Sequence, residues 1–193
     1  MNYPLFWKTA SPMRKRIYSI IFMLILATIV TILGTLVPLN IQDAKQIDNS
    51  LNQTRSEGLA NGNLIPSIFL NNFGLCLAMF IPVVGAIFGL FVLFSTGIAI
   101  GAEIQVQSST VASAPILNIS PTTAIVSLVV FGLVFLLEYV SYSIGIAESI
   151  WLYRRLRQRR WNELKNAAKF IGIVAIFLIV GAVIETWLIV TIG

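Results

Sequence analysis

The chain has 193 residues, of which 57% are hydrophobic and only 11% are charged, and its mean hydropathy is +0.87. Soluble domains carry about 25% charged residues, so this composition excludes a soluble globular protein and indicates a polytopic membrane protein. The net charge is +5, and apolar runs occupy most of the chain, which leaves room for a single helical bundle and no separate soluble domain.

The first apolar run, from Ile17 to Pro38, predicts a membrane helix over residues 17–38. It is about as long as a full span and lacks a small-residue cleavage site, so we expect a retained helix and not a cleavable signal peptide. Basic residues precede it, and the positive-inside rule therefore places the N-terminus in the cytoplasm. These residues are Lys8, Arg14, Lys15 and Arg16.

The next segment, residues 39–66, is polar and close to neutral, and we expect it to form a loop on the outer face. Ile41, Ile47 and Leu51 recur at roughly helical spacing, and Gly58 offers a stop signal. This pattern fits a short amphipathic helix, and an irregular surface loop is the alternative.

A second apolar run, from Ser67 to Gly101, is too long for one span and is interrupted at Pro82. Proline cannot donate a backbone hydrogen bond, and it disfavours helix at the residue before it. The interruption predicts two helices, over residues 67–81 and 83–101. The first is short, and it either crosses the membrane or re-enters on the side from which it came.

Two adjacent asparagines, Asn71 and Asn72, lie in the short helix. Their amide groups need hydrogen-bond partners at a depth where lipid offers none. We therefore expect them to bond to a neighbouring helix or to water.

The helix after Pro82 carries two GxxxG spacings, which let helix backbones approach closely. We expect these glycines to serve packing between helices of one bundle, and a dimer face or a substrate opening is the alternative. They are Gly85, Gly89, Gly97 and Gly101. The Ser/Thr/Gln-rich stretch that follows, from Glu103 to Ser120, predicts a solvated loop.

Pro121 is suited to the first turn of the next helix, which we predict over residues 122–151. At 1.5 Å per residue this helix would be about 45 Å long, more than the roughly 30 Å hydrocarbon core, so it must tilt, break or project. A final helix is predicted over residues 170–192.

Three glutamates, Glu138, Glu148 and Glu185, lie inside these apolar runs. A carboxylate in hydrocarbon is costly, so each must face protein, water or a partner. Glu148 lies near the cytoplasmic end of its helix, where the cost is lower. The three glutamates and the two asparagines are the intramembrane candidates for a functional site.

The segment between the last two helices, residues 152–169, is strongly basic and should be cytoplasmic. Because the N-terminus is also inside, four crossings must separate the two basic segments. The prediction is therefore an all-α polytopic bundle of about five membrane helices with its C-terminus outside, and a four-span bundle is less favoured. Beside a membrane, such arginines indicate topology and contact with anionic lipid head groups, not nucleic-acid binding. The arginines are Arg154, Arg155, Arg157, Arg159 and Arg160.

Conventional active-site chemistry has little material in this sequence. The chain has no histidine and one cysteine, Cys76, which lies in an apolar run and is expected to be a small buried hydrophobe. It also has no phosphate-binding glycine loop. We therefore expect no metal, no other cofactor and no autonomous enzyme, although an accessory place in a membrane enzyme complex fits.

Several short motifs occur together in one known family. An apolar run enters paired asparagines at residues 68–72, the spaced glycines follow with Thr96-Gly97 between them, and glutamates close the segments 135–138 and 181–185. This pattern, over about residues 67–193, resembles the stage II sporulation protein M family of integral membrane proteins.

The family pattern has Asn-Gly where this chain has Thr96-Gly97, and a Pro-His-Gly-x-x-Glu segment around the position of Glu138. This chain lacks the Pro-His, so no role of that histidine carries over. The sporulation member resembles a scaffold that works with cell-wall-degrading partners. The resemblance implies a multi-spanning helical subunit that acts with partner proteins.

Two functions fit these observations. The first is a non-enzymatic subunit or scaffold of a larger membrane complex, in which the glutamates bond to polar groups across helices. The second is a transporter or channel component, in which Glu138 and Glu185 line a polar route. The expected partners are membrane lipids and other integral membrane proteins, and a homo-oligomer is also compatible.

Overall fold

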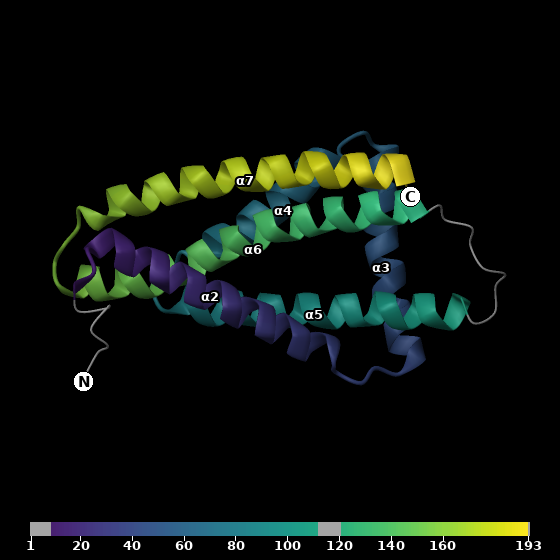
Figure 1. The fold of residues 1–193 in the computed structure, drawn as a ribbon, viewed down its shortest axis with the longest axis horizontal. Helices are drawn as coiled ribbons and strands as arrows, with labels where there is room; N and C mark the ends of the chain where they lie inside the picture. Colours follow the sequence, from purple (N-terminus) through teal and green to yellow (C-terminus); the bar gives the residue numbers. More distant parts are fainter. Residues whose placement is uncertain (1–8, 112–120, 193) are drawn as a thin grey trace.

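The computed structural model describes residues 9–111 and 121–192, and this part of the chain is helical and contains no strand. The all-α fold expected from the sequence is confirmed. Four helices are long and apolar enough to cross a membrane, and a shorter one is also apolar. The helices, labelled as in Figure 1, are α2 (Pro12–Thr35), α3 (Ile41–Ala60), α4 (Leu64–Met79), α5 (Val84–Val111), α6 (Pro121–Arg157) and α7 (Glu163–Ile192).

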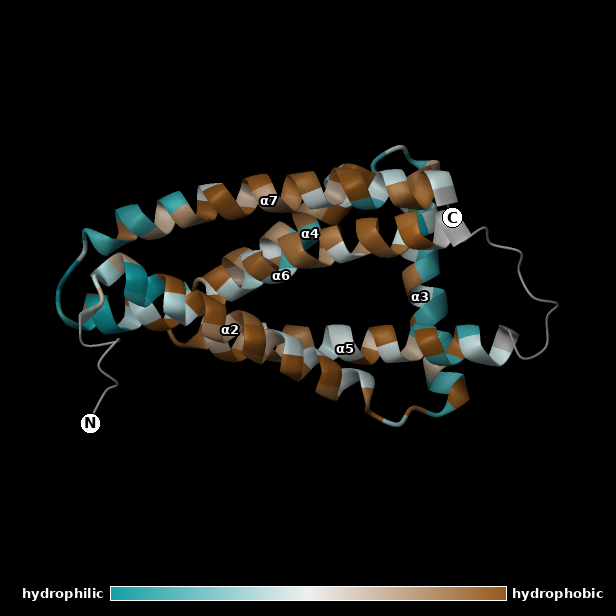
Figure 2. Ribbon diagram, viewed as in Figure 1, coloured by the Kyte–Doolittle hydropathy of each residue, from teal (hydrophilic) through white to brown (hydrophobic). Residues whose placement is uncertain are grey.

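All of these helices except α3 run lengthwise, and α3 lies across one end of the molecule (Figure 1). The start of α2 and the turn between α6 and α7 lie at the opposite end, which we call the basic end because both segments carry arginines. The end that holds α3 is called the α3 end. Apolar residues dominate the lengthwise helices, while hydrophilic residues gather at the α6–α7 turn and along α3 (Figure 2). Such a distribution is typical of a bundle that spans a membrane.

Three helices extend further at a polar end than the apolar runs that predicted them, whereas α2 ends at Thr35 and α4 at Met79, before the predicted ends at residues 38 and 81. α5 continues to Val111, so Glu103 lies in a helix and not in the solvated loop that we expected. α6 continues to Arg157 and α7 begins at Glu163, so the basic loop predicted over residues 152–169 is reduced to a short turn. Hydropathy marks where a helix leaves the membrane, whereas Gln, Arg, Lys and Glu favour helix in water as well.

α2 also begins earlier than its apolar run, and its capping explains why. The Ser11 side chain accepts a hydrogen bond from the Arg14 amide at 3.4 Å, and Pro12 occupies the first turn. Both features favour a helix start at this point. As a result, Arg16 lies within the helix and not in a flexible flank.

α3 settles the choice that the sequence left open for residues 41–60 in favour of a helix. Asn40 caps its start, where the side-chain Oδ1 accepts a hydrogen bond from the Gln42 amide at 2.8 Å. An ion pair of 2.9 Å between Arg55 Nη1 and Glu103 Oε1 connects α3 to α5. The Gln105 side chain adds a hydrogen bond to the Leu39 carbonyl at 3.1 Å.

Pro82 separates α4 from α5, as expected, and a residue of α6 stabilises the break. Val83 adopts a left-handed backbone with φ of 68°. Ser149 of α6 donates a hydrogen bond to the Ile81 carbonyl at 2.6 Å and accepts one from the Ala86 amide at 3.2 Å. The same two backbone groups also bond within the turn, the Ile81 carbonyl to the Gly85 amide and the Ala86 amide to the Val83 carbonyl. The Ser149 hydroxyl therefore connects α6 to a turn whose backbone is already hydrogen-bonded.

The middle of α6 passes through the centre of the bundle. Residues 141–149 are all buried, on every side of the helix. Many of them are small, which lets the neighbouring helices approach closely. The small residues of this stretch are Ser141, Ser143, Gly145, Ala147 and Ser149.

The four glycines of α5 lie at contacts between helices of this bundle. Gly97 faces the Thr31 carbonyl and lies close to Gly34 on α2, and Gly101 faces the backbone of Thr35. Gly85 lies against the Met79 carbonyl at the α4–α5 turn. Gly89 lies against the Ile146 side chain of α6. Sequence patterns identified these glycines on α5 but missed Gly34, their counterpart on α2.

We expect Gly97→Leu to destabilise the bundle by about 3 kcal/mol, because any side chain at this position would meet the backbone of α2, which cannot move aside cheaply. Gly74→Leu is the matched control, since an added Cβ at Gly74 meets nothing within 4 Å. The two variants can be compared by thermal unfolding of the protein in detergent. Equal midpoints would show that close approach at Gly97 does not hold α2 on α5.

Candidate functional site

The polar residues predicted inside the membrane lie in two separate groups. Glu148 lies in the second half of α6 and pairs with Arg16, whereas Glu138 interacts with Asn72, which bonds to Asn71, and with Glu185. The sequence separates Glu148, near the cytoplasmic end of its helix, from Glu138 and Glu185, but it did not predict the partners of either group. Each group draws its residues from at least three helices.

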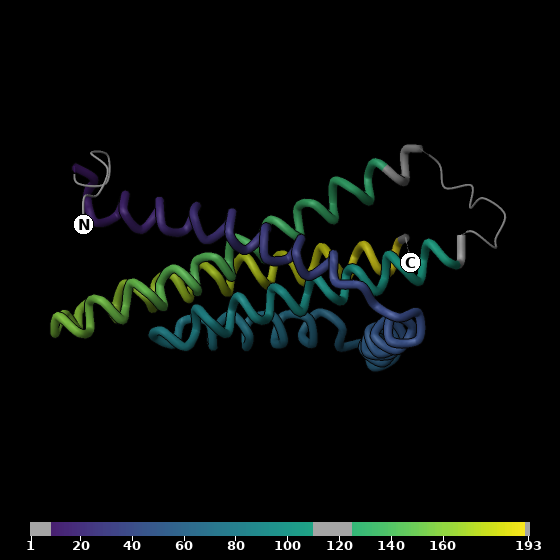
Figure 3. The backbone as a smooth tube through the Cα atoms, turned by 90° about the horizontal axis from the view of Figure 1, so that it is seen from below, coloured from purple at the N-terminus to yellow at the C-terminus, as the bar shows by residue number. Residues whose placement is uncertain are grey.

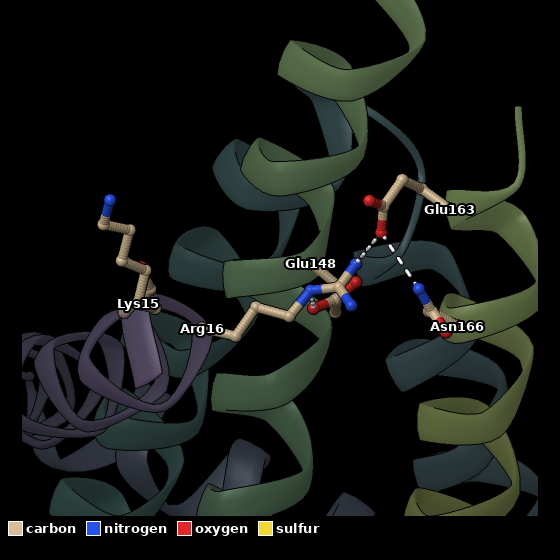
Figure 4. Close-up of polar contacts among 6 residues, drawn as sticks. Lys15, Arg16, Glu148, Glu163 and Asn166 are labelled. Atoms are coloured by element: carbon tan, nitrogen blue, oxygen red, sulfur yellow. Dashed lines mark hydrogen bonds and ion pairs between the residues drawn. The ribbon is translucent and has the colours of Figure 1, made fainter. Parts of the chain in front are cut away.

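Arg16 is the centre of the first group. Its Nε lies 3.1 Å from Glu148 Oε1, and its Nη2 lies 2.7 Å from Glu163 Oε2 (Figure 4). Only 8% of the Arg16 side chain and 1% of the Glu148 side chain are exposed, compared with 19% for Glu163. The contact with Glu163 is also a hydrogen bond, whereas the contact with Glu148 is an ion pair without hydrogen-bond alignment. One cation thus connects α2, α6 and α7.

Aromatic rings complete the surroundings of Arg16. Its Cζ lies 5.1 Å from the centroid of the Trp151 ring and 5.6 Å from that of Phe170. Arg155 Cζ lies 4.6 Å from the same Trp151 ring, on a helix that also carries Glu148. A guanidinium over an aromatic face is attracted by the ring quadrupole, most strongly where water is excluded. We call Arg16, Glu148, Trp151, Glu163 and Phe170 the Arg16 cluster.

The charges of the Arg16 cluster balance once its neighbours are included. Asn166 donates a hydrogen bond to Glu163 Oε2 at 3.1 Å, which holds this carboxylate towards Arg16 (Figure 4). Arg155 interacts electrostatically with Glu163 and supplies the second positive charge. Two arginines therefore face two glutamates, so that neither buried carboxylate lacks a counter-charge.

No local pattern in the sequence indicates this cluster. The positive-inside rule assigns Arg16 to topology alone, and Glu163 is the single acid of a basic segment. Glu163 lies 147 positions after Arg16, so no local pattern could connect them. The available signal was Glu148 itself, because a carboxylate in an apolar run requires a partner.

The second group forms around Glu138. Asn72 donates a hydrogen bond from Nδ2 to Glu138 Oε1 at 2.6 Å. Asn71 donates to Asn72 Oδ1 at 3.2 Å, which orients the amide so that its NH₂ faces the carboxylate. Glu138 and Glu185 lie close enough to interact electrostatically. We call these four residues the Glu138 cluster.

Polar groups continue from the Glu138 cluster towards the α3 end. Glu185 interacts electrostatically with both Arg55 and Glu103, which form the ion pair between α3 and α5. The Glu138 cluster is thereby connected, through Glu185 on α7, with the helix that crosses the end of the bundle.

The other residues singled out in the sequence are the arginines of the basic segment, which are mostly exposed, and Cys76, which is buried. Among the predicted arginines, Arg154, Arg157, Arg159 and Arg160 are exposed, whereas Arg155 packs on Trp151. Cys76 is buried, and its Sγ lies 3.4 Å from the Ser141 carbonyl. Over residues 9–111 and 121–192, no three or more His, Cys, Asp or Glu side chains come together as a metal site would require.

The chain matches a known protein family over most of its length. The match is to Stage II sporulation protein M and covers residues 19–188, which include both the Arg16-facing segment of α6 and the Glu138 cluster. No curated protein and no solved structure matches the chain. With its apolar helices and this match across nearly the whole bundle, the chain belongs to the Stage II sporulation protein M family of membrane proteins.

Proposed function

We propose that this protein is a non-enzymatic membrane subunit that packs with other integral membrane proteins in a larger complex. The observation that carries the proposal is the first half of α6, which diverges from the rest of the bundle (Figure 3). Most of its apolar side chains from residue 125 to 133 are exposed, including Ile125 at 63%, Leu128 at 72% and Val129 at 65%. The same helix is buried on every side over residues 141–149.

Gly132 lies in this exposed segment and leaves room for a partner helix to approach closely. An added Cβ at Gly132 would meet nothing within 4 Å, so no contact within the described chain requires a glycine. Glycine costs about 1 kcal/mol relative to alanine inside a helix, and its common use in membranes is the close approach of a second helix. A partner helix seated at Gly132 would use this property.

The two polar clusters also support a structural role. The carboxylates of Glu148 and Glu163 face arginines, and that of Glu138 accepts a hydrogen bond from Asn72. These groups connect helices, and none of them is placed beside a nucleophile–base pair of the kind that covalent catalysis uses. A scaffold needs this internal bonding in order to present a fixed surface to its partners. A membrane enzyme complex is one setting in which such a subunit would serve.

The test is extraction of the native complex in mild detergent, followed by native mass analysis of wild-type protein and the Gly132→Leu variant. We expect the wild type to retain other membrane proteins in fixed stoichiometry and Gly132→Leu to lose them while its own thermal unfolding is unchanged. Gly172→Leu on α7, where an added Cβ also meets nothing, is the control for a bulky residue on the bundle exterior. A wild-type protein that remains a lone monomer or a homo-oligomer would contradict the proposal.

A second candidate function is ion or proton transport through the Glu138 cluster. The supporting observation is that two carboxylates and two amides from α4, α6 and α7 lie near one another inside an apolar bundle. Intramembrane ionisable groups of this kind occur on ion pathways. Glu138→Gln, which removes the titratable proton, separates transport from a structural role.

A further inference from the structure

The α4–α5 turn leaves part of the basic end uncovered. α4 has 16 residues and is about 24 Å long, whereas α6 has 37 residues and is about 55 Å long. The α4–α5 turn accordingly ends well short of the α6–α7 turn (Figure 3). Beyond this turn, α6 and α7 extend without α4 beside them.

An apolar hollow of about 290 Å³ lies at this place. Its lining includes Leu77 and Pro82 from α4 and the α4–α5 turn, Leu152 of α6, and Leu164 and Ala168 of α7. Leu77 and Leu164 are 39% and 46% exposed. We call this hollow the notch. It has the composition that suits a hydrocarbon chain and offers little to a polar ligand.

A second hollow, of about 480 Å³, adjoins the notch along the chain. Its lining residues are Arg159, Arg160, Trp161, Asn162 and Glu163, and Leu164 of the notch follows directly. Glu163 is already paired with Arg16, whereas no ion pair of Arg159 or Arg160 is found within the described residues. Trp161 is 65% exposed, and tryptophan is enriched where helices leave the membrane. The two arginines are thus available to an anion at the membrane surface.

The left-handed backbone of Arg159 is an independent observation that points to a role for its side chain. The Arg160 amide bonds to the Arg155 carbonyl at 3.1 Å and the Arg159 amide to the Leu156 carbonyl at 2.8 Å, which is the Schellman pattern that ends a helix. Arg159 occupies the left-handed position of this motif with φ of 59°. Glycine fills that position in most helices because a side chain is strained there. Arginine at this position strains the backbone. It also places a positive charge in the lining of the second hollow.

We propose that one anionic phospholipid binds at this end of the bundle, with an acyl chain in the notch and its phosphate between Arg159 and Arg160. A single phospholipid presents both an apolar chain and an anionic group, as the two hollows require, and their linings meet in the chain at Glu163 and Leu164. The exposed Trp161 is of the residue type enriched at the level of the head groups. Binding at this site is thus more specific than a general attraction of the basic segment for anionic lipid, because it uses two particular arginines and a defined apolar surface.

The test is titration of the detergent-purified full chain with phosphatidylglycerol and with phosphatidylcholine, followed by native mass spectrometry. We expect phosphatidylglycerol to bind at least about tenfold more tightly, and Arg159→Gly and Arg160→Gln each to weaken it about fivefold, as expected for one cation near an anionic head group. Arg157→Gln is the control, since it removes the same charge from α6 outside the second hollow.

Arg159→Gly separates a binding role from a structural one. Glycine relieves the left-handed strain, so this variant should unfold at an equal or higher temperature without lipid while it binds phosphatidylglycerol more weakly. Ala168→Phe fills the notch and leaves both arginines in place, and it should also weaken phosphatidylglycerol binding.

Three results would overturn the proposal. Equal weakening by Arg157→Gln would indicate diffuse attraction to the whole basic segment. Equal binding of phosphatidylcholine, or full binding by Ala168→Phe, would show that the two hollows do not act together. Displacement of phosphatidylglycerol by inorganic phosphate at similar concentration would indicate a site for a free anion.

Discussion

Arg16→Met is expected to destabilise the folded bundle by about 3–5 kcal/mol, because it removes the cation from a buried ion pair and leaves Glu148 without a counter-charge. Glu148 is 1% exposed, so water cannot replace the arginine. Methionine retains much of the apolar contact of the arginine stem with Trp151 and Phe170, which confines the change mainly to charge. The measurement is reversible unfolding of the purified protein in detergent.

Arg14→Met is the matched control, since Arg14 lies in the same first turns of α2 but is exposed. It should change the unfolding free energy by less than about 0.5 kcal/mol. The double variant Arg16→Met/Glu148→Leu should recover much of the lost stability, because replacement of both partners of a buried pair by apolar groups is often neutral. Arg16→Met that behaves like Arg14→Met would show that Arg16 does not hold α2 to α6 and α7.

Arg16 has a structural role in addition to the role in topology that the sequence indicates, because it pairs with Glu148 and Glu163. A positive residue at the start of a membrane helix favours one orientation during insertion, and this holds for Arg14, Lys15 and Arg16 alike. Only Arg16 is buried in the folded bundle. Its position in the helix, directly before the apolar run, lets it face α6 and α7, whereas Arg14 is exposed.

Composition and apolar runs were sufficient to predict the all-α bundle, because most of each apolar run is helical in the described part of the chain. The Pro82 break was predictable for the same reason, since proline acts through local geometry. The end of α5, the end of α6 and the start of α7 were not predictable from hydropathy, because Glu103, Arg154, Arg155 and Lys165 are polar residues that still favour helix. Helix ends in such segments depend on capping and tertiary contacts.

The candidate site was predictable in its residues but not in its pairings. Glu138, Asn71 and Asn72 stood out because each is polar in an apolar run, and the structure brings them together. Nothing local indicated that Glu148 would face Arg16, because this contact depends on how α2 packs on α6. The exposure of Ile125 and Leu128 was equally hidden, because the sequence of α6 is apolar on both its buried and its exposed half.

Glu138→Gln and Asn72→Leu are expected to have opposite effects on stability. Glutamine retains an oxygen that accepts the hydrogen bond of Asn72 and removes a charge from apolar surroundings, so the bundle should be at least as stable as the wild type. Asn72→Leu leaves the Glu138 carboxyl without its donor and should destabilise the fold by about 1.5–3 kcal/mol. Thermal unfolding of both variants in detergent measures the difference.

The same pair of variants distinguishes a structural role of Glu138 from transport. Glutamine cannot carry a proton, so a route through Glu138 would lose proton flux in Glu138→Gln proteoliposomes that contain a pH-sensitive dye, even though the protein remains folded. Glu57→Gln on the exposed face of α3 is the control for the loss of one carboxylate. On the proposed subunit function, Glu138→Gln retains its membrane partners and the wild type shows no flux that the substitution could abolish. Flux that is present in wild type, unchanged in Glu57→Gln and absent in Glu138→Gln would instead assign the Glu138 cluster to transport. The substitution replaces one carboxyl oxygen by nitrogen, so it would then have abolished proton flux without unfolding the protein.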